Sequence, residues 1–403
     1  EWWASKGYMV IIQDVRGMGS SEGVFNGFSQ EASDTSETHE WVRSLKECNG
    51  KLGLYGFSYQ GFTQLTGELN SKPPDCLSPA MTGMNIKDHW CSDGGAYWWH
   101  NNIAWGLQIA ALKMKRENNL FEWGKIRLAL ENKSYLREGI DILKKYDPNS
   151  FVLEWLKNLN NARPFEEFKP ISTWIKQPML IIGGLWDPHL KGAFDLYKKS
   201  KEAGGSPEII IGNATHLNWW EGSQESLLKF FDKHLKSDEK FNSKNLKDEK
   251  KIWNISLNKW EELDNKFHPE FIFGLKSDGT ANLEVEDGSL TINSKGSGWF
   301  TIVNDPWRPT PSDGGHLGPN PGKFNRSIID KRLDVGVFQT NSFEEDQYLR
   351  GVPTLEIQVK SDQPNFDICL ALSLVEEGNE KVNQFSTGFL RVKNSKISEE
   401  CTY

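Results

Sequence analysis

The sequence predicts a mixed α/β domain with a helical insertion, followed by a domain made of β-strands. Three observations indicate this order. Apolar runs, typical of strands buried in a parallel sheet, occupy residues 7–13, 51–55, 76–84, 178–183 and 208–212. Amphipathic helical patterns occupy residues 31–46, 192–203 and 223–236. Beyond residue 252 the apolar period becomes two, which is typical of half-buried strands.

The expected domain limits follow from changes in composition along the chain. We expect an α/β domain at 1–236, in which residues 86–170 form a helical, tryptophan-rich cap over a site. Residues 236–251 are dominated by Lys, Asp, Asn and Ser, as in a solvated linker. Residues 252–403 are expected to form a β-sandwich, with clear alternation at 354–360.

The two ends of the chain suggest a piece of a longer protein. The sequence begins at Glu1 rather than Met and ends at Tyr403 without a terminal element. We therefore expect both domains to be truncated, the first without its initial sheet strands and the second without its last strands. The compartment and the oligomeric state stay open at this stage.

Composition narrows the functional class. The 403 residues are 25% charged and 37% hydrophobic, with a net charge of −8, as in a soluble globular protein. Mixed charges without a basic face argue against a nucleic-acid partner. No apolar run approaches the ~20 residues of a membrane-spanning helix. The five cysteines form no CxxC pair, so neither a zinc site nor a disulfide framework is indicated, and no cofactor or metal is expected.

A serine-centred turn is the most informative motif of the chain. It is Gly56-Phe57-Ser58-Tyr59-Gln60-Gly61, which follows a predicted strand and precedes a predicted helix at 62–69. A strand, a serine between small residues and a helix form the nucleophile elbow of an α/β-hydrolase. The turn is so tight that glycine relieves clashes beside the serine. The sequence departs from the strict G-x-S-x-G frame, because Gln60 stands where the second glycine is usual.

A serine nucleophile needs a base, and the base needs an orienting acid. In α/β-hydrolases they follow the serine in the order acid, histidine, on loops after strands. Of eight histidines, only His216 follows a predicted sheet strand by a few residues. Asp187 follows the strand at 178–183, although an Asx-turn before the next helix is its alternative role. His189 is too close to Asp187 in sequence to serve as the base, so the expected triad is Ser58, Asp187 and His216.

Acyl transfer also needs hydrogen-bond donors for the oxyanion. The backbone N–H of Tyr59, the residue after the nucleophile, is the expected first donor. The second is expected upstream of residue 1. Since loss of one donor costs about 10²–10³ in turnover, we expect residues 1–403 to be inactive and poorly folded when made alone.

These motifs together resemble the cocaine esterase and X-Pro dipeptidyl-peptidase family of hydrolases, the CocE/NonD group. That family carries G-x-S-Y-x-G at its elbow, which accounts for Gly61 and for Gln60. The other matching segments are Gly7 to Gly17, Ser21 to Gly23, Leu185 to Asp187, Asn213 to His216, Phe231 to Leu235 and Ile252 to Trp260.

The resemblance implies an α/β-hydrolase with a helical cap, followed by a galactose-binding-like jelly roll. It also implies a tyrosine hydroxyl, outside this sequence, as the second oxyanion donor. Family activities include ester hydrolysis, α-amino ester hydrolysis or acyl transfer, and release of X-Pro dipeptides. The α-amino ester hydrolases place carboxylates two and three residues after the catalytic Asp. His189 and Leu190 stand there instead, so that subclass is disfavoured.

The expected partner is a small ester or a peptide-like substrate. A tryptophan-rich cap favours a hydrophobic acyl group, with Trp186 and Trp90 as expected contacts, although core packing is the ordinary role of such tryptophans. Three hypotheses remain open: a serine hydrolase of esters or X-Pro amides, an acyltransferase with the same acyl-enzyme, and a non-catalytic carbohydrate- or ligand-binding protein with a vestigial triad.

Overall fold

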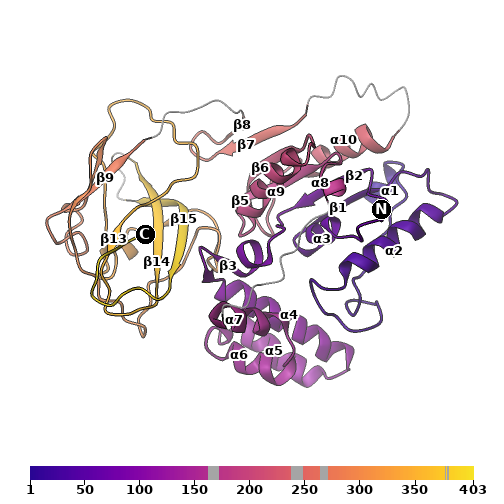
Figure 1. Cartoon of the computed structure of the whole chain (residues 1–403), viewed down its shortest axis with the longest axis horizontal. Coiled ribbons are helices and arrows are strands. Elements are labelled where there is room, and N and C mark those ends of the chain that lie inside the picture. The colour runs from indigo at the N-terminus through magenta and orange to yellow at the C-terminus, as the bar shows by residue number, and fades with distance from the viewer. Residues whose placement is uncertain (162–171, 237–247, 264–270, 377, 379–380) are drawn as a thin grey trace. The chain divides into compact units, whose positions relative to one another are not determined.

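The computed structural model describes residues 1–161, 172–236, 248–263, 271–376, 378 and 381–403 (Figure 1). The chain divides into two compact units, Glu1–Leu263 and Asp264–Tyr403. The first unit is a mixed α/β domain, and the described residues of the second form strands, loops and one short 3₁₀ turn. This agrees with the expected order of an α/β domain followed by an all-β domain.

A six-stranded sheet organises the first unit. Its spatial order is β1 (Gly53–Phe57), β2 (Cys76–Ala80), β5 (Leu180–Trp186), β6 (Glu208–Thr215), β7 (Lys250–Asn254) and β8 (Lys259–Glu262). The first five strands are parallel, and β8 pairs antiparallel with β7. Four of these strands match the predicted apolar runs that follow residue 50.

Alternate residues of β5 enter two different cores, which explains why its sequence is apolar throughout. Ile181 belongs to a cluster with Leu196 of α9 (Leu190–Glu202), whereas Ile182 belongs to a cluster with Phe230 of α10 (Ser223–Leu235). Because side chains alternate across a strand, a run buried on both faces must be continuously apolar. The sheet is therefore covered on both sides (Figure 1).

The elements that flank the sheet are four short helices and three longer ones, of which α9 and α10 join strands of the sheet. They are α1 (Trp2–Ser5), α2 (Glu31–Ser44), α3 (Tyr59–Phe62), η1 (Thr63–Leu65), α8 (Ser172–Ile175), α9 (Leu190–Glu202) and α10 (Ser223–Leu235). The helix expected at 62–69 is shorter than predicted. It ends by Leu65, and Thr66 is extended.

The expected cap is helical and has a core of its own. After the π-helical turn η2 (Lys87–Cys91) and the hairpin β3 (Ser92–Asp93) and β4 (Ala96–Tyr97), four helices follow: α4 (Trp99–Arg116), α5 (Leu120–Glu131), α6 (Tyr135–Tyr146) and α7 (Phe151–Asn161). Ile103, Leu107, Ile126 and Leu143 are fully buried in their shared cluster. Figure 1 shows α4 to α7 gathered in one bundle. Residues 162–171 of the expected cap lie outside the described residues.

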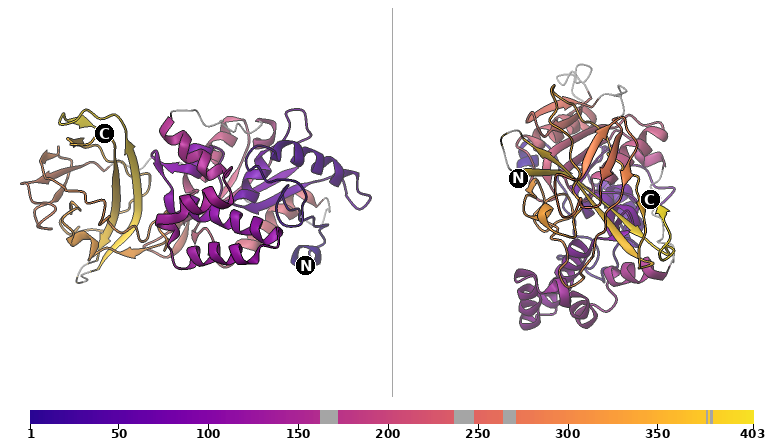
Figure 2. Two further views of the ribbon diagram at one scale, coloured as in Figure 1. Left: turned by 90° about the horizontal axis from the view of Figure 1, so that it is seen from below. Right: turned by 90° about the vertical axis from the view of Figure 1, so that its left-hand side faces the viewer.

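The described residues of the second unit form three small sheets. These are β10-β9-β11 (Ser289–Ile292, Phe273–Ser277, Ser297–Gly298), β12-β15-β14 (Phe324–Asn325, Val382–Val392, Phe366–Val375) and β13-β16 (Gln358–Val359, Cys401–Thr402), with the 3₁₀ turn η4 (Ile329–Lys331). The hairpin of β14 and β15 is the longest pairing, and Figure 2 shows it as the long yellow strands. The run expected at 354–360 is a strand only at Gln358–Val359.

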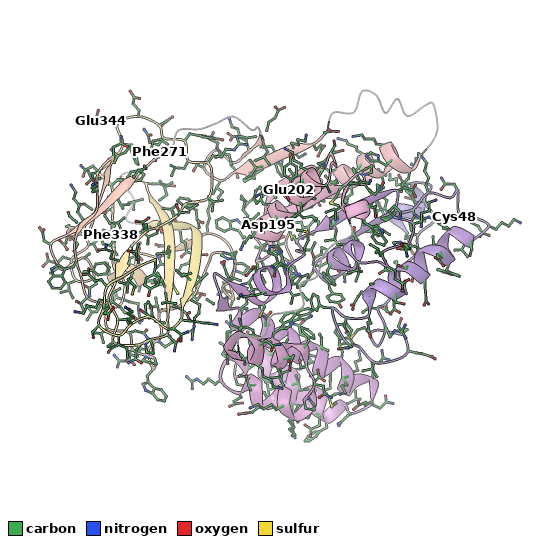
Figure 3. All side chains as sticks on the ribbon, viewed as in Figure 1. Cys48, Asp195, Glu202, Phe271, Phe338 and Glu344 are labelled. Atoms are coloured by element: carbon green, nitrogen blue, oxygen red, sulfur yellow. The ribbon has the colours of Figure 1, made fainter. Side chains whose placement is uncertain are left out.

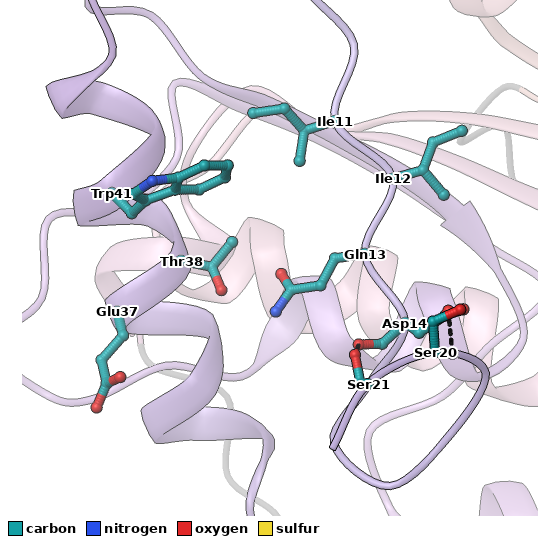
Figure 4. Close-up of a pocket in the computed structure, with 9 residues that line it drawn as sticks. All are labelled: Ile11, Ile12, Gln13, Asp14, Ser20, Ser21, Glu37, Thr38 and Trp41. Carbon is teal, nitrogen blue, oxygen red and sulfur yellow. Dashed lines mark hydrogen bonds between the residues drawn. The ribbon is translucent and has the colours of Figure 1, made fainter.

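The strand expected at 7–13 is absent, so the βαβ unit predicted from it is wrong. Residues 8–13 pair with no strand, and Ile12 is 88% exposed. A cavity of about 540 Å³ separates this segment from α2, between Ile11, Gln13 and Trp41 (Figure 4). An apolar run becomes a strand only when a neighbouring strand accepts its backbone hydrogen bonds, and none lies beside it among the described residues.

The boundary between the domains also differs from the prediction. We expected the β domain to begin at 252, but residues 250–262 form β7 and β8 of the first sheet, and the second unit begins at Asp264. Ile252 pairs in register with Ile211 of β6 and packs against the core cluster that contains Ile211. The apolar period of residues 250–262 therefore does not show which unit they belong to. Most of the expected linker, residues 237–247, lies outside the described residues.

Among the described residues, no helix combines the length and the apolar character that crossing a membrane requires. In the same residues, no three His, Cys, Asp or Glu side chains gather in a way that could hold a metal ion.

His39 of α2 should make stability depend on pH. Its ring is 5% exposed and stacks on Trp174 at 5.4 Å, and its Nδ1 has no partner among the described residues. Burial, aided by the charge of Arg43, lowers the pKa of His39 to about 4. Between that value and the ordinary ~6.5, only the unfolded chain binds the proton, so the free energy of unfolding falls as pH falls through this window.

The substitution His39→Phe keeps an aromatic ring against Trp174 and removes the titrating group. Urea unfolding at about pH 7.5 and about pH 5 should show a smaller acid destabilisation in the variant than in the wild type, by the linkage relation. Equal pH dependence of the two proteins would show that His39 is not a buried neutral imidazole.

Candidate active site

Ser58, Asp187 and His216 each follow the last residue of a parallel strand. Ser58 follows β1, Asp187 follows β5 and His216 follows β6. The carboxyl ends of parallel strands meet at one edge of the sheet, which is where open α/β sheets place their sites. The topology therefore brings the three predicted residues to the same edge.

Ser58 lies in a strained turn between β1 and α3. Its backbone has φ 58° and ψ −126°, a combination that non-glycine residues rarely adopt. Its N–H donates to the carbonyl of Ala80, at the end of β2, at 2.9 Å. The chain therefore reverses at one residue, which leaves the serine at the tip of the turn.

The glycines of the elbow explain how Gln60 is tolerated. A Cβ on Gly56 would lie 2.6 Å from the Cβ of Gln60, so the turn accepts a side chain at 60 only because there is none at 56. A Cβ on Gly61 would lie 2.8 Å from Thr82 Cγ2 and 3.0 Å from the Ala80 carbonyl. The second glycine is therefore required one position later, where α3 crosses the end of β2.

Asp187 and His216 form a buried hydrogen-bonded pair. His216 Nδ1 lies 2.5 Å from Asp187 Oδ2, and Asp187 Oδ1 accepts the backbone N–H of His189 at 2.8 Å. The Asp187 side chain is fully buried, whereas that of His216 is 27% exposed. The carboxylate thus fixes one ring nitrogen and leaves the exposed face of the imidazole for chemistry.

The loop that carries His216 is held from several sides. Trp186 donates its indole N–H to Asn213 Oδ1 at 2.8 Å, and Trp219 donates to the His216 carbonyl at 3.3 Å. A Cβ on Gly184 would lie 2.5 Å from the Ala214 carbonyl, so β5 and β6 approach closely here. The ring of Phe57, the residue before Ser58, lies 5.4 Å from that of His216.

His189 is the nearby histidine, and its contacts differ from those of His216. Its Nδ1 lies 2.6 Å from the His89 carbonyl, and its ring lies 5.3 Å from that of His216. Burial lowers the pKa of His189 to about 4. One oxygen of Asp187 is bonded to the ring of His216, and the other accepts the backbone N–H of His189.

Tyr59 contributes more than the backbone N–H that the sequence predicted. As the first residue of α3, its N–H has no acceptor within the helix. Its hydroxyl accepts the N–H of Phe28 at 2.9 Å and donates to Glu31, which is 4% exposed. Burial, then Glu31, raises the pKa of Tyr59. No local pattern predicts this bond, because it joins Tyr59 to a buried acid 28 residues away along the chain.

The two expected substrate contacts are packing residues in the structure. Trp186 is 4% exposed and its N–H is bonded to Asn213. Trp90 is 3% exposed, donates to the Gly83 carbonyl at 2.8 Å, and packs with Phe62 and Trp155. Neither leaves a ring face for a substrate, so the ordinary role of a tryptophan, core packing, applies to both.

Comparison with known proteins identifies the family of the chain. Residues 1–218, more than half of the chain, match the family described as X-Pro dipeptidyl-peptidase (S15 family). The chain belongs to this family. Residues 241–401 match the X-Pro dipeptidyl-peptidase C-terminal non-catalytic domain.

A similar protein is the cocaine esterase of Rhodococcus sp. (strain MB1 Bresler). It is 23% identical over 408 residues, which cover 91% of this chain and 70% of the relative. The resemblance inferred from the motifs is thus confirmed, and the chain is a hydrolase of the serine peptidase and esterase type.

The spacing of the elbow gives a stability test with a matched control. Gly61→Ala places a Cβ against Thr82 and the Ala80 carbonyl, and such overpacking costs roughly 1–3 kcal/mol. Gly124→Ala in α5 meets nothing within 4 Å and should stabilise by roughly 0.5–1 kcal/mol. Denaturant unfolding of the two variants should move in opposite directions. A neutral Gly61→Ala would contradict the tight elbow.

Proposed function

We propose that this protein cleaves acyl esters or amides with Ser58 as nucleophile, His216 as general base and acid, and Asp187 as the group that orients His216. The observation that carries the proposal is the 2.5 Å contact of His216 Nδ1 with the fully buried Asp187, beside a strained serine turn. A buried carboxylate bonded to a partly exposed imidazole is the arrangement that activates a hydroxyl.

Acylation would begin with proton transfer from Ser58 to Nε2 of His216. The Ser58 oxygen bonds to the substrate carbonyl carbon, and the carbonyl oxygen becomes an oxyanion. His216 then gives the proton to the leaving alcohol or amine, and an ester on Ser58 remains. Asp187 accepts the N–H of His216 Nδ1, which keeps the proton on that nitrogen, and stabilises the imidazolium that forms.

Deacylation would repeat these steps with water. His216 accepts a proton from the water that attacks the acyl-enzyme and returns it to Ser58 as the acid leaves. The N–H of Tyr59, which has no acceptor within α3, is our proposed donor to the oxyanion in both steps. A second donor would add further stabilisation.

The proposed substrate is a small ester or a peptide-like amide. The similarity to a cocaine esterase supports an ester, and the family description supports release of an X-Pro dipeptide as the second candidate. The β domain, which matches a non-catalytic domain, is proposed to adopt a jelly roll without supplying a triad residue.

The first test is covalent labelling with a fluorophosphonate probe, which reacts with activated serines. In the full-length protein, the wild type should be labelled and Ser58→Ala should not, whereas Ser44→Ala, which changes an exposed serine at the end of α2, should label normally. Asp187→Asn should slow labelling strongly, since the equivalent change in a serine protease costs about 10⁴ in turnover. Labelling that survives Ser58→Ala would refute the proposal, and a wild type without labelling would favour the non-catalytic hypothesis.

The second test separates the two substrate classes. Hydrolysis of p-nitrophenyl esters and of X-Pro p-nitroanilides should be compared by kcat/KM on the same preparation. We expect ester cleavage to dominate, because the relative that aligns with 91% of this chain is a cocaine esterase. A higher kcat/KM for the X-Pro amide would replace the ester proposal by the peptidase.

A further inference from the structure

Two further histidines, His189 and His89, lie near the Asp187–His216 pair, and the proposed mechanism assigns a role to neither. His216 is bonded to Asp187 Oδ2. His189 lies beside both of them, and His89, in the π-helical turn η2, lies behind His189. The rings of His89 and His189 are 3% and 5% exposed.

The hydrogen bonds of His89 fix its tautomer. Its Nδ1 accepts the backbone N–H groups of Met84 and Asn85, both at 3.1 Å. Its Nε2 must then carry the proton, which it donates to Asp195 Oδ2 at 2.8 Å. This bond lowers the pKa of Asp195. Figure 3 labels Asp195, which lies on α9 and is 44% exposed.

The hydrogen bonds of His189 fix its tautomer in turn. Its Nδ1 must carry a proton because the partner at 2.6 Å is the carbonyl of His89, which can only accept. Its own backbone N–H donates to Asp187 Oδ1. Trp90 and Trp98 pack on its ring at 4.4 and 5.5 Å. The ring of His189 is therefore held by η2 and by Trp98, while the backbone N–H of the same residue is bonded to Asp187.

The groups that face His189 favour a neutral imidazole. Burial, the largest effect, and the charge of His216 oppose its charged form, whereas Asp187 and the hydrogen bond to the His89 carbonyl favour that form, and the pKa of His189 falls to about 4. A protonated His189 would place a second cation beside His216 when His216 accepts the serine proton. A neutral ring avoids this repulsion.

We propose that His189 is a positioning residue for the reaction: it anchors the Asp187–His216 pair to the His89 carbonyl, and Asp195 holds His89 in place. The proposal rests on the proposed function, and it assigns a role to two histidines and one acid that the triad does not use. The chain of contacts runs from α9 through η2 to the sheet edge. A shift of His189 would thus tilt the base without removing any triad group.

Two substitutions at 189 separate the hydrogen bond from the volume of the ring. His189→Asn retains a donor at the position of Nδ1, and His189→Leu retains bulk without a donor. With p-nitrophenyl butyrate as the substrate, we expect His189→Leu to lower kcat roughly 10–100-fold, since about 1 Å of misplacement costs that much. KM should change little, and His189→Asn should recover most of kcat.

A pH profile distinguishes positioning from simple support of the fold. In His189→Leu the acidic limb of kcat/KM should move to lower pH, because the imidazolium of the base loses part of its carboxylate support. In His189→Asn the limb should stay near that of the wild type. Loss of stability alone would lower the amount of active enzyme and leave the limb unmoved.

A substitution at Asp195, whose side chain is 44% exposed, tests the proposal independently. Asp195→Ala removes the acceptor of His89, and the matched control Glu202→Ala removes an exposed acid on the same helix that pairs with Lys199 (Figure 3). We expect kcat to fall several-fold in the first variant, as typical for loss of an orienting bond, and to stay unchanged in the second. Equal activity of both variants would contradict the proposal, even if His189→Leu fails to fold.

Fluorophosphonate labelling separates this proposal from the proposed function. If the wild type is not labelled at Ser58, the hydrolase mechanism fails and the positioning role fails with it. If the wild type is labelled and His189→Leu matches it in kcat and in pH profile, the mechanism stands and only the role of His189 is overturned. Equal impairment of His189→Asn and His189→Leu would likewise overturn the anchoring bond.

Discussion

The burial of the Asp187 carboxylate is the constraint on which the rest of the site depends. A carboxylate removed from water costs several kcal/mol unless hydrogen bonds and partners replace its hydration. Here one oxygen accepts the N–H of His189 and the other is bonded to His216. His189 lies in the loop after β5 and His216 in the loop after β6, and these two strands are neighbours in the sheet. The hydrogen bonds that replace the hydration of Asp187 therefore also fix the position of one loop relative to the other.

The sheet edge and the serine turn complete this arrangement. Parallel strands place their carboxyl ends together, so Ser58 reaches the same edge as Asp187. The strain of the Ser58 backbone is offset by its bond to the Ala80 carbonyl and by the missing side chains at 56 and 61. Rigid elements thus hold the nucleophile, while hydrogen bonds hold the base.

The sequence predicted the features that depend on local pattern and chain order. The elbow, the strands at 180–186 and 208–215 and the positions of Asp187 and His216 follow from apolar runs and from the residues after them. The prediction of a strand at 7–13 was wrong because an apolar run does not show whether a neighbouring strand is present to pair with it. Residues 250–262 pair with the sheet of the first unit, which their sequence does not show, because a strand has the same apolar period in either sheet.

The contacts made by long-range packing could not be predicted. Trp186 and Trp90 are of a residue type that often lines a substrate site. Only the folded chain shows that their rings are buried and that their N–H groups are hydrogen-bonded. His189 looked like a competitor for the base because sequence spacing does not reveal that its Nδ1 faces the His89 carbonyl. Hydrogen-bond partners one hundred residues apart leave no local signal.

The most direct test of this account is a proton NMR spectrum of the hydrogen-bonded imidazole N–H groups, with ¹⁵N-labelled histidine for assignment. The account predicts a far-downfield resonance from His216 Nδ1–H that is lost in His216→Gln and that persists in Ser58→Ala. It would be contradicted by a spectrum in which no downfield resonance depends on His216 or in which the resonance is unaffected by Asp187→Leu. Either result would mean that the buried carboxylate does not orient this histidine.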